Sequence, residues 1–310
     1  MEHIICVAGP TASGKTKLAV ELARAYNGEV LSCDSMQIYR GMEIGTAAPT
    51  PDEMQGVPHH MIGVVSPKED FSVGKYVEMA EPILQDILSR GKTCVVCGGT
   101  GLYADSLLLG RSFAPCPSTG VREALEQEAA QSGIGPLLLR LQAVDPEAGA
   151  RLHPSDVRRI IRALEVYLET GETISEHNRR TKLLPPRHEA VWIGLTFAAR
   201  QDLYNRIDLR VEKMLEAGLL DEIRALLASG VPPAATAMQA IGYKEYVECL
   251  TNGGSLDAAT ALVQQRSRNY AKRQLTWLRR NEQIHWIQQP EKPEFSAVFQ
   301  QATQNIPFFA

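Results

Sequence analysis

The chain has 310 residues, of which 44% are hydrophobic and 22% charged, a composition that is ordinary for a globular protein and excludes a largely disordered one. Its net charge of −4 argues against indiscriminate nucleic-acid binding. No stretch is apolar for long enough to cross a membrane and no cleavable signal precedes the first strand, so we expect a cytoplasmic protein whose scattered cysteines are reduced.

The stretch from residue 9 to residue 16 fits the phosphate-binding pattern G-x-x-x-x-G-K-[ST] at every fixed position. It consists of Gly9, Pro10, Thr11, Ala12, Ser13, Gly14, Lys15 and Thr16. An apolar run at 3–8 precedes it as a buried strand, and a helical pattern at 16–25 follows it. Strand, loop and helix together predict that backbone N–H groups and Lys15 bind a phosphate chain, with the Thr16 hydroxyl as a ligand of Mg²⁺.

Two further predicted strands end in polar residues that should lie beside the phosphate loop. Residues 29–33 lead into Asp34, and residues 92–97 lead into Thr100. Ligands bind beyond the carboxyl ends of strands in open α/β sheets, so the three loops should converge on one crevice. Asp34 taken alone is better explained as a helix N-cap or a turn former, a common role for Asp after a strand. Many nucleotide hydrolases carry a metal-binding Asp near the position of Thr100, and its absence here weakens an ATPase interpretation.

The segment between these strands is predicted to be a long ordered loop at 41–70, followed by a helix that Ser72 caps and that runs towards residue 90. His59 and His60 lie in the loop, but no third ligand stands at a recognisable spacing, so a metal site is not expected there. Cys94 and Cys97 are spaced like a metal pair, yet residues three apart on a strand point to opposite faces.

Helical segments alone are predicted after residue 110, at 121–131 (capped by Ser118), 135–143 and 157–170, until a strand at 190–196 returns the chain to the sheet. More helices follow at 202–216, 219–228, 241–250 and 255–280, and then a last strand at 284–287. We therefore predict an α/β protein with a P-loop-containing parallel sheet core flanked by helices. Residues 1–112 and 189–310 should form this core, and residues 113–188 an inserted all-helical subdomain.

Two basic stretches stand out against the acidic average. Residues 258–281 contain no acidic residue, and residues 151–188 contain eight basic residues, counting Arg151, against five acids. The basic side chains concerned are Arg158, Arg159, Arg162, Arg179, Arg180, Lys182, Arg187, Arg266, Arg268, Lys272, Arg273, Arg279 and Arg280. Such runs are usually solvated helix faces, but two of them in one chain make RNA or DNA a serious candidate for a partner.

With these segments in order, the sequence resembles the tRNA dimethylallyltransferases, also called isopentenyl-tRNA transferases. The segments that carry the resemblance are residues 9–16 (GPTASGKT), 34–40 (DSMQIYR), 58–60 (PHH), 98–103 (GGTGLY), 156–165 (DVRRIIRALE), 241–245 (IGYKE) and 270–277 (YAKRQLTW). The resemblance covers most of the chain. The chain has no C-terminal Cys/His pairs, so it is similar to the shorter bacterial form.

The resemblance implies transfer of a dimethylallyl group from dimethylallyl diphosphate to N6 of the adenosine beside the anticodon, with Mg²⁺ as cofactor and diphosphate as product. The chemistry of the residues accommodates this. The phosphate loop and Lys15 can stabilise the leaving diphosphate, with Thr100 assisting. Asp34 is our candidate for the general base that takes the proton from N6, and Gln37 for the residue that reads the adenine edge.

The resemblance also implies residues that contact the tRNA, with the helical insertion binding the anticodon stem-loop. The residues so implied are Asp34, Ser35, Met36, Gln37, Thr100, Arg122, Arg158, Arg159, Ile160, Ile161, Arg162, Gly242, Tyr243 and Lys244. We expect a monomer that does not bind membranes. Two alternatives stay open: a small-molecule kinase that uses ATP on the same loop, and an RNA-binding protein that the loop switches through a bound nucleotide. A kinase would turn over ATP without RNA, and a switch would bind RNA without turnover.

Overall fold

The structure is a computed structural model that describes residues 3–110 and 119–307. The chain divides into two compact units, one formed by Met1–Leu109 together with Arg187–Ala310 and the other by Gly110–Pro186. The sequence placed the same division at 113 and 188. Within the described ranges, no helix combines the length and the apolar character needed to cross a membrane.

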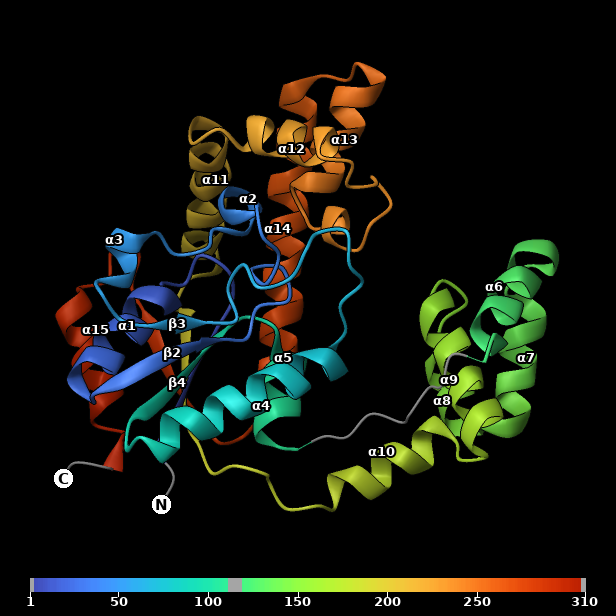
Figure 1. Cartoon of the computed structure of the whole chain (residues 1–310), viewed down its shortest axis with the longest axis horizontal. Coiled ribbons are helices and arrows are strands. Elements are labelled where there is room, and N and C mark those ends of the chain that lie inside the picture. Colours follow the sequence, from blue (N-terminus) through green and yellow to red (C-terminus); the bar gives the residue numbers. More distant parts are fainter. Residues whose placement is uncertain (1–2, 111–118, 308–310) are drawn as a thin grey trace. The chain divides into compact units, whose positions relative to one another are not determined.

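The larger unit is built on a parallel sheet of six strands in the order β3-β2-β4-β1-β5-β6 (Figure 1). The strands are β1 (Ile4–Ala8), β2 (Gly28–Ser32), β3 (His59–His60), β4 (Thr93–Gly98), β5 (Val191–Phe197) and β6 (Ile284–Gln289). The predicted parallel α/β core is confirmed. Because β4 lies between β2 and β1, the carboxyl ends of these three strands are neighbours, and so are the loops that follow them.

Helices cover both faces of this sheet, which explains why β1 and β4 are apolar on both sides. Helices α1 (Lys15–Ala25) and α15 (Phe295–Thr303) pack on one face, and α4 (Val73–Ser89) and α5 (Gly101–Leu108) on the other (Figure 1). All five residues of β1 are buried. Strands that are buried on both faces consist of continuous apolar runs, and these runs are the feature from which we predicted the strands.

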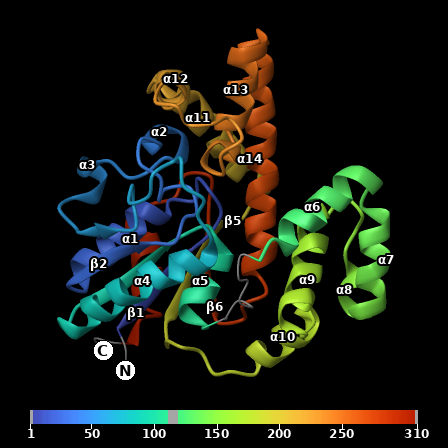
Figure 2. The same cartoon turned by 45° about the vertical axis from the view of Figure 1, so that its right-hand side comes forward.

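A separate hydrophobic cluster joins the four later helices of this unit to the loop after β2. These helices are α11 (Arg200–Glu216), α12 (Leu219–Ala228), α13 (Tyr243–Asn252) and α14 (Leu256–Leu278), with a short 3₁₀ turn at Ala237–Gln239. Figure 2 shows α14 as a long helix that lies beside α13 at one end and reaches the sheet at the other. The loop at 41–70 is ordered, as predicted, and contains two short helices, α2 (Glu43–Thr46) and α3 (Pro51–Met54), as well as β3.

The smaller unit is entirely helical in its described part and has a core of its own, formed by leucine, isoleucine and alanine side chains. Its helices are α6 (Val121–Ser132), α7 (Gly135–Val144), α8 (Pro146–Arg151), α9 (Val157–Thr170) and α10 (Ile174–Lys182). Helix α9 begins and ends where the sequence predicted, and Gly171 closes it in the left-handed conformation. The predicted cap Ser118 lies outside the described residues, and Gly120 stands at the N-cap position of α6.

Candidate functional site

The phosphate loop joins β1 to α1, and its backbone requires glycine at two positions. Gly14 is the N-cap of α1 with φ at 90°, and Gly9 has φ at 153°. A Cβ on Gly9 would also lie 2.7 Å from the carbonyl oxygen of Leu195, so a side chain there would push β1 away from β5. The loop therefore takes a conformation in which backbone N–H groups at a helix N-terminus face the space beyond the sheet, the arrangement that binds phosphate.

Two half-buried cations lie at this loop. The Lys15 ammonium donates a hydrogen bond of 2.7 Å to the carbonyl oxygen of Pro10. Burial lowers the pKa of Lys15, and the nearby guanidinium of Arg210 adds to this effect, whereas the charge of Asp34 opposes it. Burial also lowers the pKa of Arg210, again opposed by Asp34. The charge of Asp34 acts on both cations and that of Glu53 on Arg210, so the loop carries cations that a phosphate chain can pair with.

Asp34 follows β2 and is held in a fixed orientation. Its Oδ1 atom accepts hydrogen bonds from the backbone N–H groups of Met36, at 2.9 Å, and Gln37, at 3.3 Å. This is the turn that the sequence offered as the alternative to a catalytic role, and it uses one carboxylate oxygen. Within the described residues the other oxygen, Oδ2, makes no hydrogen bond, so the turn orients Asp34 and leaves a proton acceptor free.

Thr100 links the loop after β4 to the loop after β2. Its hydroxyl oxygen accepts a hydrogen bond of 3.2 Å from the backbone N–H of Ser35 and lies 3.4 Å from the Ser35 hydroxyl. Tyr270 lies close to both loops: burial, reinforced by the charge of Asp34, raises the pKa of this phenol to about 12. Asp34, Thr100 and Lys15 are thus brought into one site, as the strand order predicts.

The side-chain amide of Gln274, on α14, connects the phosphate loop to the loop of Thr100. Its oxygen accepts from the backbone N–H of Thr11, and its nitrogen donates to the carbonyl oxygen of Gly99, both at 2.9 Å. The amide fits because Gly99 has no Cβ; an added Cβ would overlap the Gln274 nitrogen. One helix turn further on, the Trp277 ring packs against Gly101, and its indole N–H donates a hydrogen bond of 2.9 Å to the Asp105 carboxylate.

The residues at the loop fit a magnesium ion that is shared with a substrate phosphate. The Thr16 hydroxyl makes no hydrogen bond within the described residues, and Thr16 lies in the first turn of α1. No cluster of three or more His, Cys, Asp or Glu side chains suited to a metal is present in the described part of the chain. Mg²⁺ commonly takes one or two protein oxygens and completes its shell with phosphates and water, so it needs no such cluster.

Comparisons with known proteins agree with this geometry. A family model described as IPP transferase matches residues 37–281, and one described as isopentenyl transferase matches residues 2–63. The chain belongs to the IPP transferase family. It is 44% identical over 292 residues to a tRNA dimethylallyltransferase of Acetivibrio thermocellus, with 94% of this chain and 93% of the relative covered. A tRNA dimethylallyltransferase of Geobacillus kaustophilus is 44% identical over 308 residues, with 98% and 96% covered.

Solved structures of this family have the same fold. A tRNA isopentenylpyrophosphate transferase from Bacillus halodurans matches with a TM-score of 0.73 at 38% identity, covering 98% of this chain and 95% of that one. A eukaryotic dimethylallyltransferase described as acting on tRNA matches with a TM-score of 0.83 at 28% identity, covering 98% of this chain and 77% of that one.

The side chains of the family-implied tRNA residues on α9 fall into two groups. Ile160 and Ile161 are buried in the core of the smaller unit, where they pack α9 against its neighbours. Arg158 and Arg159 are exposed; Arg159 pairs with Asp156 at 3.2 Å, and Arg158 has no ion pair with any described residue. The exposed arginines are therefore the α9 side chains placed to meet a partner.

Two further arginines of this set, Arg122 and Arg162, share a carboxylate. Arg162 contacts Glu165 at 3.0 Å, and Arg122 contacts the same oxygen at 3.3 Å. The Glu165 side chain is only 8% exposed, so the pair holds α6 to α9. Both arginines keep part of their surface exposed.

In the larger unit, the residues that the family resemblance implies as tRNA contacts also include both buried and exposed side chains. Tyr243 is fully buried, and its hydroxyl donates a hydrogen bond of 2.5 Å to Glu222. Burial is the main cause that raises the pKa of this phenol, and the hydrogen bond to Glu222 adds to it. The N–H of Gly242 donates to Glu245 at 2.7 Å, whereas Lys244 is exposed. The Gln37 amide donates 3.1 Å to the carbonyl oxygen of Ala47. A contact of Gln37 with adenine stays a prediction, because its amide already supports the protein's own loop.

Sequence reasoning did not single out Arg210 or assign a role to Gln274. Arg210 follows Arg206 by one turn of α11, directly after β5, and this spacing on the helix that leaves the sheet was the available signal. The Arg206 side chain donates a hydrogen bond of 3.1 Å to the carbonyl oxygen of Ala12. The Arg210 guanidinium lies 3.5 Å from the carbonyl oxygen of Thr46. The two arginines therefore connect α11 to the phosphate loop and to the loop after β2.

Proposed function

We propose that this protein transfers a dimethylallyl group from dimethylallyl diphosphate to N6 of the adenosine on the 3′ side of the anticodon in tRNA, with release of diphosphate. The observation that carries the proposal is the meeting of Lys15, Asp34 and Thr100 at one edge of the sheet, in a chain that belongs to the IPP transferase family. The kinase and the nucleotide-switch alternatives are not favoured by the names of the relatives.

The reaction needs an anion cradle, because the bond that breaks joins the allylic carbon to a diphosphate oxygen. Its electron pair leaves with the diphosphate, and negative charge grows on the departing oxygens. The backbone N–H groups of the phosphate loop that are not donated within the protein, together with the Lys15 ammonium, can stabilise that charge, and the half-buried guanidinium of Arg210 adds to the positive field. A bound Mg²⁺, held in part by Thr16, would supply further charge neutralisation of the diphosphate.

The new bond joins adenine N6 to the allylic carbon, and N6 must lose a proton in the process. Asp34 is the acceptor we propose, since the turn fixes its carboxylate through Oδ1 and leaves Oδ2 for the substrate. Thr100 holds Ser35, the residue after Asp34, which keeps the carboxylate loop and the loop after β4 in a constant relation. General-base catalysis by a group held in this way contributes typically about a hundredfold or more.

The target base must leave its stack to reach such a site, which costs a few kcal/mol. Binding of the flanking RNA backbone by exposed cations offsets this cost, and Arg158, Arg159 and Lys244 are the candidates whose side chains are available. We also propose a cytoplasmic location, because relatives of this chain are tRNA dimethylallyltransferases, and a monomeric state, because each unit has its own hydrophobic core.

The proposal is tested by incubating the purified protein with unmodified tRNA, dimethylallyl diphosphate and Mg²⁺ and then analysing the nucleosides. We expect prenylated adenosine in equal amount to released diphosphate. A tRNA with the adenosine beside the anticodon replaced by guanosine is the control and should stay unmodified. Rapid turnover of ATP in place of the prenyl donor, with no modified adenosine in the complete mixture, would instead establish the kinase alternative.

A further inference from the structure

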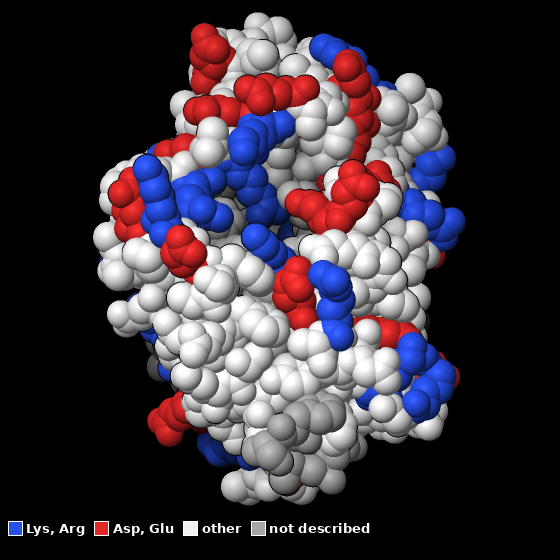
Figure 3. All heavy atoms as spheres, turned by 90° about the vertical axis from the view of Figure 1, so that its left-hand side faces the viewer, with Lys and Arg blue, Asp and Glu red and all other residues white. Residues whose placement is uncertain are grey.

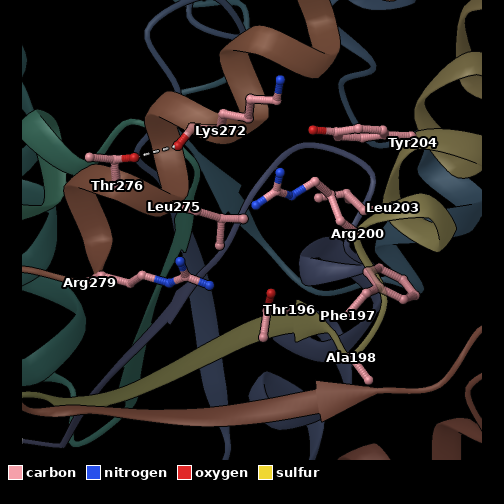
Figure 4. A pocket seen from close by; sticks show the side chains of 10 residues that line it. All are labelled: Thr196, Phe197, Ala198, Arg200, Leu203, Tyr204, Lys272, Leu275, Thr276 and Arg279. Carbon is pink, nitrogen blue, oxygen red and sulfur yellow. Dashed lines mark hydrogen bonds between the residues drawn. The ribbon is translucent and has the colours of Figure 1, made fainter.

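A second cavity lies on the larger unit, beyond the carboxyl end of β5 and between α11 and α14 (Figure 4). Its volume is about 390 Å³, within the range of small-molecule sites. The residues that line it are Thr196, Phe197, Ala198, Arg200, Leu203, Tyr204, Lys272, Leu275, Thr276 and Arg279. None of them belongs to the site described above.

The cavity is strongly cationic. Arg200, Lys272 and Arg279 line it, no lining residue is acidic, and none of the three forms an ion pair with a described residue. In Figure 4 the guanidinium groups of Arg200 and Arg279 extend into the space from opposite sides. On one face of the molecule, Figure 3 shows Lys and Arg side chains gathered in a hollow with acidic side chains around it. Like charges that surround one space repel each other, and an anion placed among them removes that repulsion.

The wall of the cavity also offers an unused hydrogen-bonding group and an apolar surface. The Tyr204 hydroxyl is buried and has no hydrogen-bond partner within the described part of the chain. A buried polar group left without a partner costs about 1 to 3 kcal/mol, which a ligand oxygen would recover. Phe197, Leu203 and Leu275 form the apolar part of the lining. A ligand with both phosphates and a carbon skeleton fits this combination.

The cavity adjoins the phosphate loop, but none of its lining residues belongs to that loop. The Ala12 side chain packs against the cluster formed by Phe197 and Leu203, so the loop forms part of the cavity's support. Arg206 lies 5.4 Å from the centre of the Phe197 ring and donates to the Ala12 carbonyl oxygen. The lining residues of α14 flank Gln274, which holds Thr11. The two helices that line the cavity therefore also brace the loop.

We propose that this cavity is a second anion site, which binds a small molecule carrying a diphosphate or triphosphate group independently of the phosphate loop. The phosphates contact Arg200, Lys272 and Arg279, the Tyr204 hydroxyl donates to one of their oxygens, and the rest of the ligand lies against Phe197 and Leu275. The inference does not depend on the transferase activity, because it rests on the charge and the unpartnered hydroxyl of the cavity.

The test is isothermal titration of the full-length protein with inorganic diphosphate and, separately, with ATP. Four proteins are compared: wild type, Lys15→Ala, Lys272→Ala/Arg279→Ala, and Arg273→Ala/Arg280→Ala. The last is a matched control, since it removes two positive charges from the same region of the chain at exposed residues that do not line the cavity. Thermal melting establishes that each variant is folded, and Lys272→Gln/Arg279→Gln replaces the alanine pair if that pair is not.

We expect two binding events in the wild type and one in Lys15→Ala. In Lys272→Ala/Arg279→Ala the second event should weaken by roughly tenfold or more, the loss of one charge-assisted contact or more, while the control keeps both events. ATP and diphosphate binding equally at the cavity would show recognition of phosphates alone, and tighter ATP binding would show that the aromatic wall contributes. Titrations of the cavity pair that equal those of the control would overturn the proposal. Weaker tRNA binding by the cavity pair with unchanged small-molecule titrations would also overturn it.

Discussion

Gln274 gives a quantitative prediction about how the catalytic loops are aligned. Its amide is the direct link between the phosphate loop and the loop of Thr100, through two hydrogen bonds of 2.9 Å. Gln274→Ala removes both bonds and leaves the Gly99 carbonyl oxygen without its partner. At about 1 kcal/mol for a lost bond and 1 to 3 kcal/mol for an unsatisfied buried group, the aligned loops lose about 2 to 4 kcal/mol.

Prenyl transfer depends on that alignment, so the loss should appear in the rate of the chemical step. Each 1.4 kcal/mol of lost transition-state stabilisation slows a reaction about tenfold, and Gln274→Ala should therefore lower the single-turnover rate by roughly 30- to 700-fold. The KM for each substrate should change much less, because Gln274 contacts neither directly. Gln274→Glu can still accept from the Thr11 N–H but cannot donate to Gly99, and its rate should lie between those of the alanine variant and the wild type.

The matched control is Gln264→Ala, on the same helix, whose amide donates 3.4 Å to the carbonyl oxygen of Asp208, away from both loops. Melting temperatures measured alongside the rates separate misalignment from unfolding. The reasoning is refuted if Gln274→Ala transfers at the wild-type rate, or if Gln264→Ala slows the reaction by as much.

Three other predictions concern the base, the tRNA surface and the stability of the sheet. Asp34→Asn should lower single-turnover transfer about a hundredfold or more and leave tRNA affinity nearly unchanged; a wild-type rate removes Asp34 from the mechanism. Arg159→Ala should weaken tRNA binding and reduce its salt dependence, as measured by titration at several salt concentrations, whereas Arg224→Ala, an exposed arginine on α12, should do neither. Glu29→Gln should destabilise the protein at pH 7 by about 2 kcal/mol, because the Glu29 carboxylate, 4% exposed, contacts Arg90, Lys92 and His60. Hydrogen bonds from Arg90 hold the pKa of Glu29 below its ordinary value of about 4.5, so this stability is present above that value and is lost as the pH falls further. Melting curves of both proteins should therefore converge in acid, and a constant difference between them would contradict this assignment.

The sequence predicted the parts of the site that follow directly from strands. The phosphate loop, Asp34 and Thr100 each come immediately after a buried apolar run, and parallel strands deliver such residues to one edge of the sheet. The limits of α9 were also predictable, because Asp156 and Gly171 mark its ends. Helix α10 was not expected, since its nine residues are mostly polar, although the capping box of Thr173 and Glu176 was a readable signal.

Contacts between distant parts of the chain could not be predicted in the same way. Gln274 lies 263 residues from Thr11 and 175 from Gly99, and no local pattern connects them. The same holds for Arg206 and the carbonyl oxygen of Ala12, which are 194 residues apart. Ile160 and Ile161 show the opposite difficulty: a family motif marked them as RNA contacts, but their side chains fill the core of the smaller unit. A motif records which residues occur together and does not separate those that touch a ligand from those that support them.

The phosphate loop stands near the beginning of the chain, yet the last strand of the sheet helps to hold it. The amide nitrogen of Gln289, at the end of β6, donates 3.0 Å to the carbonyl oxygen of Ser13, and the two residues are 276 positions apart. During synthesis the ribosome releases residue 13 long before residue 289, so a nascent chain has the loop's sequence without its support. The phosphate loop therefore gains this support only after β6 has been synthesised and has joined the sheet, 276 residues later than Ser13.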